Sequence, residues 1–342
     1  MTDYADAGVD LEAASKAVEL IGRLARDATR PEAVEGVGGF AGLFRIGEGR
    51  LLAAATDGVG TKTEIARMAG RLDTVGIDLV AMCADDVVCT GAEPLLFLDY
   101  LAVGKVTPED VAALVEGVAE GCRRSGCALL GGETAEHPGV LEPDRFDLAG
   151  FCVGLVEERN LLGPHRVGEG DVLIGLASTG LHANGYSLVR AALLDGGAFS
   201  LEDRPDELNG RSLADELLEP TAIYAPLVLE LAEEDQLHAA AHVTGGGIPE
   251  NLPRVLPEGV GADVDLAAWT APPIFGLIQR TGRVSEEEMF RTFNMGIGMI
   301  LVVPDGAVQQ VFGMATSART EAHVIGRVSG PPGIRMSAFG TS

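Results

Sequence analysis

The chain has 342 residues, 46% of them hydrophobic and 22% charged, which suits a globular protein long enough for two domains. A net charge of −26 argues against nucleic acid or an anionic membrane as the main partner. The acidic start "MTDYADAGVD" does not resemble a signal peptide, no apolar run is long enough to span a membrane, and the five cysteines form no C-x-x-C pair. We therefore expect a cytoplasmic protein with reduced thiols.

The first half of the chain alternates helical and strand-like patterns. Apolar residues recur at helical spacing after Asp10, and "RLLAAATD" and "AGFCVGLVE" are typical of strands. A helix is predicted from Thr107-Pro108 to a stop at Gly126. Cys127 to Leu130 then reads as a short buried strand that ends in a loop at Gly131-Gly132-Glu133.

The second half repeats this organisation. "DVLIGLAS" and "HAAAHV" are predicted strands that each precede a glycine-bearing loop and a helix, and Ser285 begins a capping box. "GIGMILVVP" and "AHVIGRVS" are late strands around an amphipathic segment. We predict a mixed α/β (α+β) fold of two domains, 1–160 and 161–342, joined within "RNLLGPHRVGEG".

The stretch "AAATDGVGTKTE" combines glycines, threonines and Lys62 after a predicted strand. It is not a Walker A loop, because Thr61 rather than glycine precedes the lysine. Flexible amides at Gly58 and Gly60 and the charge of Lys62 still suit a phosphate, and Asp57 suits a hard cation such as Mg²⁺. The alternative is an ordinary strand-to-helix turn in which Asp57 caps the helix and Lys62 is solvated.

A predicted helix from about Ile77 carries acidic residues in an apolar sequence. Asp78, Asp85 and Glu93 fall on one face, and Asp86 lies about 100° further round. A solvated face is the ordinary explanation, but the apolar neighbours leave little room for one. Buried carboxylates would have to be paired or bound to a metal.

Three glycine-rich loops carry polar residues after predicted strands, where α/β proteins usually bind ligands. Glu133 is the better candidate in the first loop, and His182 and Asn184 stand in the second. His182 and His242 could transfer protons at neutral pH, although single histidines are more often structural. Thr244 and the run Gly245-Gly246-Gly247 precede a helix, which suits a phosphate better than a flexible connector does.

Taken together, these motifs resemble one family. "TDGVGTK", "GIDLVAMCADD", "GGETAEHPG", "GLHANGYSLVR", "HVTGGGIPENLPR" and "TFNMGIGM" occur in the order found in phosphoribosylformylglycinamidine cyclo-ligase, the aminoimidazole ribonucleotide synthetase of purine biosynthesis. The resemblance extends from Tyr4 to at least Met299. It implies a reaction in which ATP and Mg²⁺ close the imidazole ring of formylglycinamidine ribonucleotide.

The resemblance also implies an aminoimidazole ribonucleotide synthetase-like fold. In that fold the N-terminal sheet pairs with its copy across a homodimer, and the C-terminal domain is an α/β sandwich. Residue by residue, ATP is expected at Asp57, Gly58, Gly60, Thr61, Lys62 and Asp86, with Mg²⁺ on Asp57 and Asp86. The substrate phosphate is expected at Thr244, Gly245, Gly246 and Gly247. The catalytic candidates are His182, His242, Asn184 and Glu133.

Two positions depart from the pattern of many relatives. Ala5 replaces a lysine near the N-terminus, and Asp85 replaces an asparagine before Asp86. The first change removes a potential phosphate contact, and the second adds a negative charge near the expected metal. Another class of protein, an ATP-binding scaffold without catalysis, is disfavoured because Asp57, Lys62 and His182 are all present.

Overall fold

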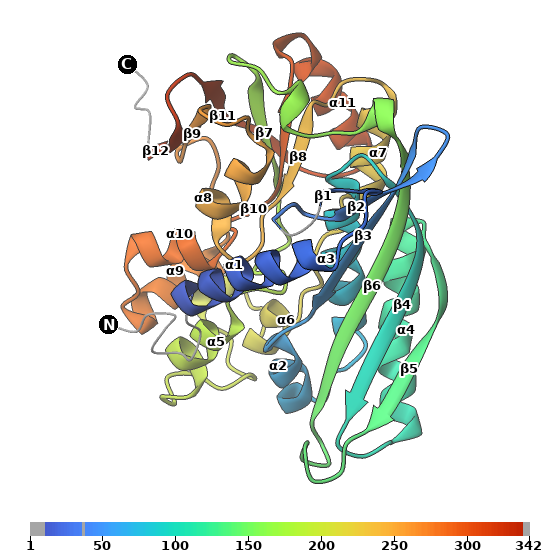
Figure 1. The fold of residues 1–342 in the computed structure, drawn as a ribbon. Coiled ribbons are helices and arrows are strands. Elements are labelled where there is room, and N and C mark those ends of the chain that lie inside the picture. Colours follow the sequence, from blue (N-terminus) through green and yellow to red (C-terminus); the bar gives the residue numbers. More distant parts are fainter. Residues whose placement is uncertain (1–10, 36–37, 338–342) are drawn as a thin grey trace.

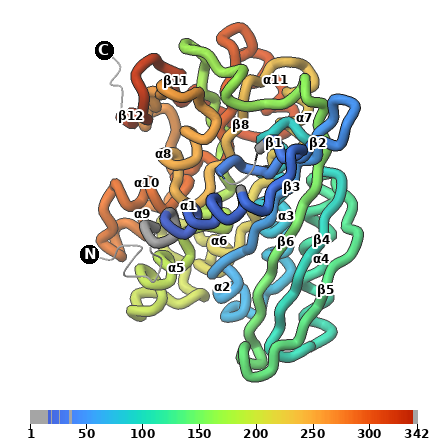
Figure 2. The backbone as a smooth tube through the Cα atoms, viewed as in Figure 1, coloured from blue at the N-terminus to red at the C-terminus, as the bar shows by residue number. Residues whose placement is uncertain are grey.

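The computed structural model describes residues 11–35 and 38–337, which form two six-stranded sheets joined through a layer of helices (Figure 1). The smooth backbone trace in Figure 2 follows the chain through the first sheet before it enters the second. Ala5 and Asp10 lie outside the described residues. Within the described part of the chain, no helix is long and apolar enough to cross a membrane.

The first sheet is mostly antiparallel, and β4 and β5 are its parallel pair. Its strands, in spatial order, are β1 (Ala33–Glu35), β2 (Gly42–Gly47), β3 (Arg50–Gly58), β6 (Phe146–Glu157), β4 (Glu93–Val103) and β5 (Ala128–Glu136). The second sheet consists of β12 (Gly333–Ser337), β9 (Gly261–Asp265), β11 (Ala322–Ser329), β7 (Val172–Ala177), β10 (Ile297–Val303) and β8 (Ala239–His242).

Eleven α-helices accompany the sheets in the described residues. They are α1 (Leu11–Asp27), α2 (Lys62–Ala69), α3 (Val75–Val88), α4 (Pro108–Ser125), α5 (Tyr186–Val189), α6 (Leu213–Leu217), α7 (Ala225–Glu233), α8 (Gly247–Asn251), α9 (Pro273–Gly282), α10 (Glu286–Thr292) and α11 (Val308–Ser317). The predicted helix stop at Gly126 is confirmed, because this residue has φ of 80° and caps α4. The predicted cap at Ser285 is also confirmed, because its hydroxyl accepts the N–H of Glu288 at 3.2 Å.

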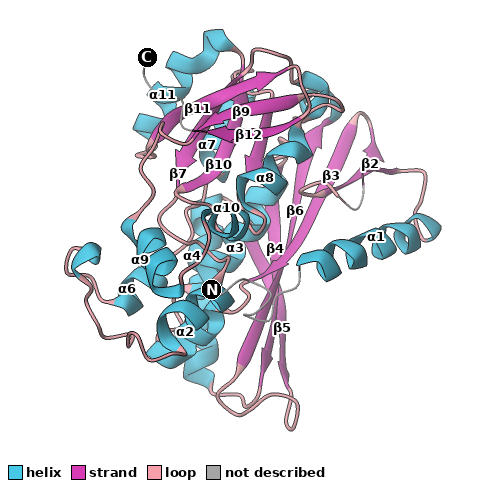
Figure 3. Ribbon diagram, turned by 90° about the vertical axis from the view of Figure 1, so that its left-hand side faces the viewer, coloured by secondary structure: helices cyan, strands magenta, loops and turns pink. Residues whose placement is uncertain are grey.

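Helices pack on one face of the first sheet, whereas the other face, the bare face, keeps apolar side chains exposed. Helices α3 and α4 pack on one face, whereas α1 lies on the opposite side of the sheet (Figure 3). Side chains alternate between the two faces of a strand, so Phe97 and Cys152 are buried while Leu98, Tyr100 and Phe151 remain exposed. A single chain therefore leaves an apolar surface on this sheet.

The central strands of the second sheet, β7 and β10, are buried on both faces, as in an α/β sandwich. Ile174 and Leu301 face a cluster with α7 and α11, whereas Leu173 and Ile300 face a cluster with α8. Burial on both faces explains why β7 and β10 read as continuous apolar runs rather than alternating ones.

Two sequence-based expectations about this fold are wrong. Cys127 to Leu130 is not a short buried strand: the strand β5 runs to Glu136, forms an edge of the sheet, and is mostly exposed. Glu133 therefore lies within a strand rather than in a loop, opposite Tyr100 of β4. Helix α3 also has no solvated face, because every residue except Asp86 is buried.

All five cysteines are free and buried, as expected for reduced core thiols.

Candidate active site

Helix α3 lies at the junction of the two halves of the chain, and its acidic residues hold the second half in place. Asp78 is fully buried, and its Oδ1 accepts the backbone N–H of Thr221 at 2.8 Å and the hydroxyl of the same residue at 2.6 Å. About two turns further along the helix, Asp85 Oδ1 accepts the N–H groups of Tyr224 at 3.0 Å and Ala225 at 2.8 Å. Asp85 thus satisfies donors at the start of α7.

Asp85 is therefore a junction residue. Burial raises its pKa to about 7, although His242 and the two N–H donors favour the charged form. The sequence suggested that Asp85 adds a negative charge near the metal. Its carboxylate is instead directed toward the start of α7. The prediction that Asp78 and Asp85 share a face is confirmed, but Glu93 belongs to β4 and not to this helix.

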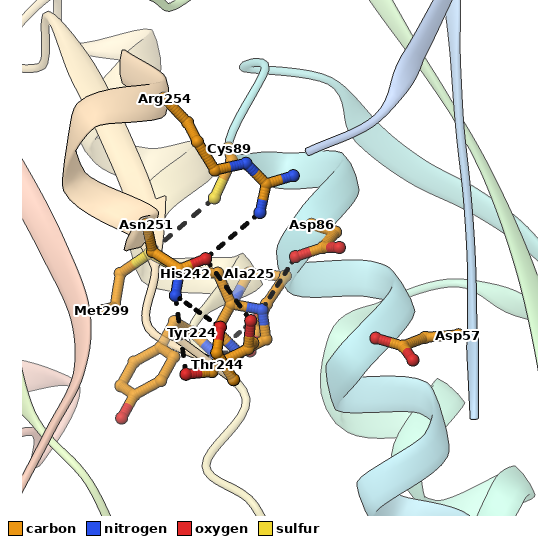
Figure 4. Close-up of polar contacts among 12 residues, drawn as sticks. Asp57, Asp86, Cys89, Tyr224, Ala225, His242, Thr244, Asn251, Arg254 and Met299 are labelled. Atoms are coloured by element: carbon orange, nitrogen blue, oxygen red, sulfur yellow. Dashed lines mark hydrogen bonds and ion pairs between the residues drawn. The ribbon is translucent and has the colours of Figure 1, made fainter. Parts of the chain in front are cut away.

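Asp86 points in another direction, toward the strand β8. Its Oδ1 accepts the Nδ1–H of His242 at 2.9 Å (Figure 4). Burial opposes the imidazolium form of His242, but Asp86, Asp85 and Asp57 outweigh it and raise the pKa of this histidine above its usual value. The Nε2 atom of His242 is buried and has no hydrogen-bond partner among the described residues.

Asp57 comes from the end of β3 and lies beside α3 (Figure 4). Its Oδ1 accepts the N–H of Gly58 at 2.7 Å. Burial, followed by the negative charge of Asp86, raises its pKa to about 6. Asp57 does not cap α2, because Thr61 is the residue before that helix. Two neighbouring carboxylates that repel each other suit a divalent cation, although no group of three or more His, Cys, Asp or Glu ligands is arranged for a metal in the described residues.

Lys62, the first residue of α2, is completely buried and is not solvated. Its Nζ donates to Asp78 Oδ1 at 2.9 Å, to the carbonyl of His182 at 3.0 Å, and to the carbonyl of Glu219 at 2.7 Å. An ammonium group has three hydrogens, and each one has an acceptor here. The predicted contact with an ATP phosphate would require at least one of these bonds to break.

His182 lies in the loop between β7 and α5 and has φ of 60°, a conformation that costs a non-glycine residue about 1 kcal/mol. Its Nε2 accepts the N–H of Thr179 at 3.2 Å, whereas its Nδ1 is buried without a partner among the described residues. Burial, with help from His242 and Lys62, lowers the pKa of His182 well below 6.5. His182 is thus a neutral imidazole with an unused polar atom.

The three glycines form the turn between β8 and α8. Gly246 and Gly247 have φ of 91° and 59°, and a Cβ on Gly247 would lie 1.9 Å from the carbonyl oxygen of Phe290. Both positions therefore need glycine for the backbone and for packing. The N–H of Gly247 is bonded to the carbonyl of Thr244 at 3.0 Å, so this donor is not free for an anion.

Gly245 differs from the other two glycines. It is exposed, its φ is not positive, and a Cβ at this position would meet only the amide nitrogen of Asn184, 3.9 Å away. The structure thus brings Asn184 beside the triple-glycine turn. Because glycine has no side chain, the space between Gly245 and Asn184 stays open.

The sequence did not point to Asn251 or Arg254. The amide of Asn251 donates to the carbonyls of Gly245 at 3.1 Å and Gly247 at 2.9 Å, and so fixes the turn. Arg254 donates to Asn251 at 3.1 Å and lies over the ring of Phe40, 3.9 Å from its centroid. Both residues follow the glycines within "GIPENLPR". This short separation from the glycines was the only sequence signal that could have placed them at the site.

Glu133 is separate from this cluster. It is exposed on β5 and forms no hydrogen bond or ion pair with the other candidate residues in the described part of the chain. Asp57, Asp86, His242, His182, Asn184 and Gly245 therefore make up the candidate site.

Known proteins resemble this chain along nearly its whole length. The family models for the N-terminal and C-terminal domains of AIR synthase related proteins match residues 38–156 and 168–338. A phosphoribosylformylglycinamidine cyclo-ligase from Anaeromyxobacter dehalogenans (strain 2CP-1) is 50% identical, with 96% of each chain covered. One from Geotalea daltonii is 49% identical, covering 95% of this chain and 94% of the relative. The chain belongs to the phosphoribosylformylglycinamidine cyclo-ligase family.

Solved structures share the fold of this family at lower identity. Thiamine-monophosphate kinase from Stenotrophomonas maltophilia is 20% identical with a TM-score of 0.62, covering 93% of this chain and 96% of the kinase. PurL of T. maritima, in complex with ADP, is 18% identical with a TM-score of 0.59, covering 89% of this chain and 44% of PurL. These two similarities concern the fold alone.

Proposed function

We propose that the cluster at the domain junction is where this cyclo-ligase family member closes an imidazole ring. Its substrates are formylglycinamidine ribonucleotide and ATP, and its products are 5-aminoimidazole ribonucleotide, ADP and phosphate. The observation that carries the assignment is the pair of buried imidazoles, His182 and His242, each with an unpartnered nitrogen. Of the two, His242 is bonded to Asp86 and interacts with Asp57. Buried polar atoms are rarely left unsatisfied, so ligand atoms are their natural partners.

The reaction transfers the γ-phosphoryl group of ATP to the formamide oxygen and releases ADP. The amidine-side nitrogen then attacks the former formyl carbon, and the C–O bond breaks as phosphate leaves. A proton lost from nitrogen must be accepted nearby, and the free Nε2 of His242 is the group best placed to exchange it. Asp86 orients that imidazole through its bond to Nδ1.

Asp57 and Asp86 are the residues we assign to Mg²⁺, with phosphate oxygens and water as the remaining ligands. When bound, the ion neutralises phosphate charge during transfer. In its absence, burial and then the negative charge of Asp86 raise the pKa of Asp57. Gly58 at the end of β3 and the exposed residues Gly60 and Thr61 lie beside them, and we assign this stretch to the ATP phosphates.

The loop from Thr244 to Gly247 and the amide of Asn184 are our candidates for the ribonucleotide. Gly245 supplies the open space, and Asn184 supplies hydrogen bonds at its edge. The substrate phosphate is our proposed ligand here, held by the turn that Asn251 fixes. Holding both substrates at one junction supplies the proximity that ring closure needs.

We also propose a homodimer. Leu98, Tyr100 and Phe151 lie exposed on the bare face of the first sheet, and a second copy of the same face would bury them. Glu133 stands on β5 beside Tyr100, so any catalytic role for it belongs to a site completed across that interface. The division into residues 1–160 and 161–342 and a cytoplasmic location remain our proposals.

The function is tested by supplying formylglycinamidine ribonucleotide, ATP and Mg²⁺ and measuring ADP and the imidazole product together. We expect equal amounts of both. Release of ADP without the imidazole product would favour a kinase-like activity, and the absence of both products would indicate a scaffold without catalysis.

A further inference from the structure

Lys62 follows directly after the proposed phosphate loop, but its side chain is buried in the protein interior. It has no solvent-accessible surface, and its three acceptors are Asp78, the His182 carbonyl and the Glu219 carbonyl, at 2.7 to 3.0 Å. One acceptor belongs to α3, and the other two belong to the second half of the chain. Lys62 therefore joins three separate segments at one atom.

The two carbonyls belong to segments that are themselves tied together. The hydroxyl of Thr179 donates to the carbonyl of Pro220 at 2.6 Å, and its N–H donates to His182 Nε2 at 3.2 Å. Thr221 donates twice to Asp78, the ion-pair partner of Lys62. The loop that carries His182 and the segment around residue 220 are thus one unit, anchored on the Lys62–Asp78 pair.

The conformation of His182 depends on an anchor of this kind. Its positive φ is unfavourable for a side chain with a Cβ, so surrounding contacts must hold it. The bond from Lys62 fixes its carbonyl while the bond from Thr179 fixes its ring. Together these two bonds fix the orientation of the ring and of its unpartnered Nδ1 atom.

Stability alone is a weak reason for this arrangement. Removing a lysine and a carboxylate from water is costly, and apolar residues of similar volume usually stabilise a core equally well. A phosphate contact is also a poor explanation, because no ammonium hydrogen is free.

We infer that Lys62 is a positioning residue: it sets the His182–Asn184 loop against the Gly58–Thr61 loop, so that nucleotide and ribonucleotide binding are coupled through it. The inference rests on the proposed assignment of these two loops to the two substrates. Ordering of the first loop by ATP is transmitted by α2 and the Lys62 ammonium to the second loop. The two coupled ligands are a nucleoside triphosphate and a phosphorylated ribosyl amidine, and binding of the first affects binding of the second.

The experiment compares wild type with Lys62→Met, with Lys62→Met/Asp78→Asn, and with Arg71→Met as a matched control. Arg71 also joins the two halves, through an exposed ion pair with Asp215 at 2.7 Å, but it does not contact the His182 loop. The double variant removes both buried charges, while its asparagine still accepts from Thr221. We therefore expect it to melt close to wild type.

For the double variant we expect kcat about 100-fold below wild type, because the His182 loop is misplaced. Its affinity for AMPPCP should stay within about threefold of wild type, because no phosphate contact is lost. In wild type and Arg71→Met, formylglycinamidine ribonucleotide should tighten AMPPCP binding by about fivefold or more, and the double variant should lose this coupling.

Three results would overturn the inference. Full recovery of kcat in the double variant would make the pair purely structural. A loss of AMPPCP affinity comparable to the loss of kcat would make Lys62 a phosphate ligand. Absence of coupling in an active wild type would remove the proposed link, whereas an inactive wild type would instead refute the proposed function.

A second measurement does not depend on how the variants fold. In wild type, AMPPCP alone should slow hydrogen–deuterium exchange in residues 179–184, although the nucleotide is assigned to the other loop. Unchanged exchange in that segment, with protection of residues 58–61, would contradict the coupling.

Discussion

At the scale of single residues, the site is distinguished by polar atoms without partners. His182 Nδ1 and His242 Nε2 are both buried and unsatisfied within the described chain. His182 lies in a loop and His242 ends the strand β8, about 60 residues later in the chain. The two histidines differ in pKa. Acidic neighbours raise the pKa of His242, whereas burial lowers the pKa of His182. The two imidazoles are therefore suited to different roles.

We predict that His182 stays neutral at mildly acidic pH. Burial lowers its pKa well below 6.5, so the imidazole should not protonate between about pH 6 and pH 8. Nitrogen-15 chemical shifts of the ring, assigned with His182→Gln, would measure this. A titration midpoint near the ordinary histidine value would contradict the buried geometry.

At the triple-glycine turn, Gly245→Val should leave the fold intact and weaken substrate binding. A side chain fits the backbone at this position, but it fills the space beside Asn184. We expect KM for the ribonucleotide to rise about 10-fold or more with little change in KM for ATP. Gly168→Val is the control, because a Cβ there meets nothing within 4 Å. If KM for ATP alone rose, the turn would belong to the nucleotide.

Lys62 shows why sequence alone could not define the site. The glycines, the following helix and the absence of a Walker A loop were all readable from "TDGVGTK". The partners of Lys62, however, lie 16, 120 and 157 residues away in the chain. Only the packing of two sheets around α3 brings them together, so a residue that looked like a phosphate ligand is a buried anchor.

At the scale of elements, α3 organises the junction. Its apolar residues pack against the first sheet, while Asp78 and Asp85 bind backbone N–H groups of the second half. The spacing of the acids was readable from the sequence, but their partners were not. The strand predicted at Cys127 to Leu130 continues to Glu136 in β5. This extension was missed because the glycines suggested a loop, whereas pairing with β4 decides the conformation.

Asp85→Asn should be tolerated, whereas Asp85→Ala should not. An asparagine Oδ1 still accepts the N–H groups at the start of α7, but alanine leaves these buried donors unpaired. We expect Asp85→Ala to lower the free energy of unfolding by about 2 kcal/mol and Asp85→Asn by less than about 1 kcal/mol. Urea denaturation would measure both, and equal losses would show that hydrogen bonding is not the contribution of Asp85.

At the scale of the whole molecule, the two sheets have different surroundings. Helices cover both faces of the second sheet, whereas the first sheet keeps Leu98, Tyr100 and Phe151 exposed. Alternation along β4 and β6 accounts for which residues are buried beneath α3 and α4. It could not show what covers the other face, because a partner's contribution is not encoded in local periodicity.

We predict that Phe151→Asp converts the proposed dimer into monomers. A charge in the centre of the bare face would be buried without a partner on association. Sedimentation velocity would measure the change, with Val324→Asp as the control because Val324 is similarly exposed but lies on β11 of the second sheet. A Phe151→Asp protein that keeps the wild-type mass would place the interface elsewhere.

The most direct test of a junction active site compares Asp86→Ala with Asp144→Ala. Asp86 orients His242 and is our candidate metal ligand, whereas Asp144 forms a more exposed ion pair with Arg67. Initial rates of ADP and aminoimidazole ribonucleotide formation are measured together for both variants, whose folding is checked by thermal unfolding. We expect both rates to fall together by about 100-fold or more in Asp86→Ala and to stay near wild type in Asp144→Ala. A folded Asp86→Ala protein with near-normal formation of both products would contradict the proposed site.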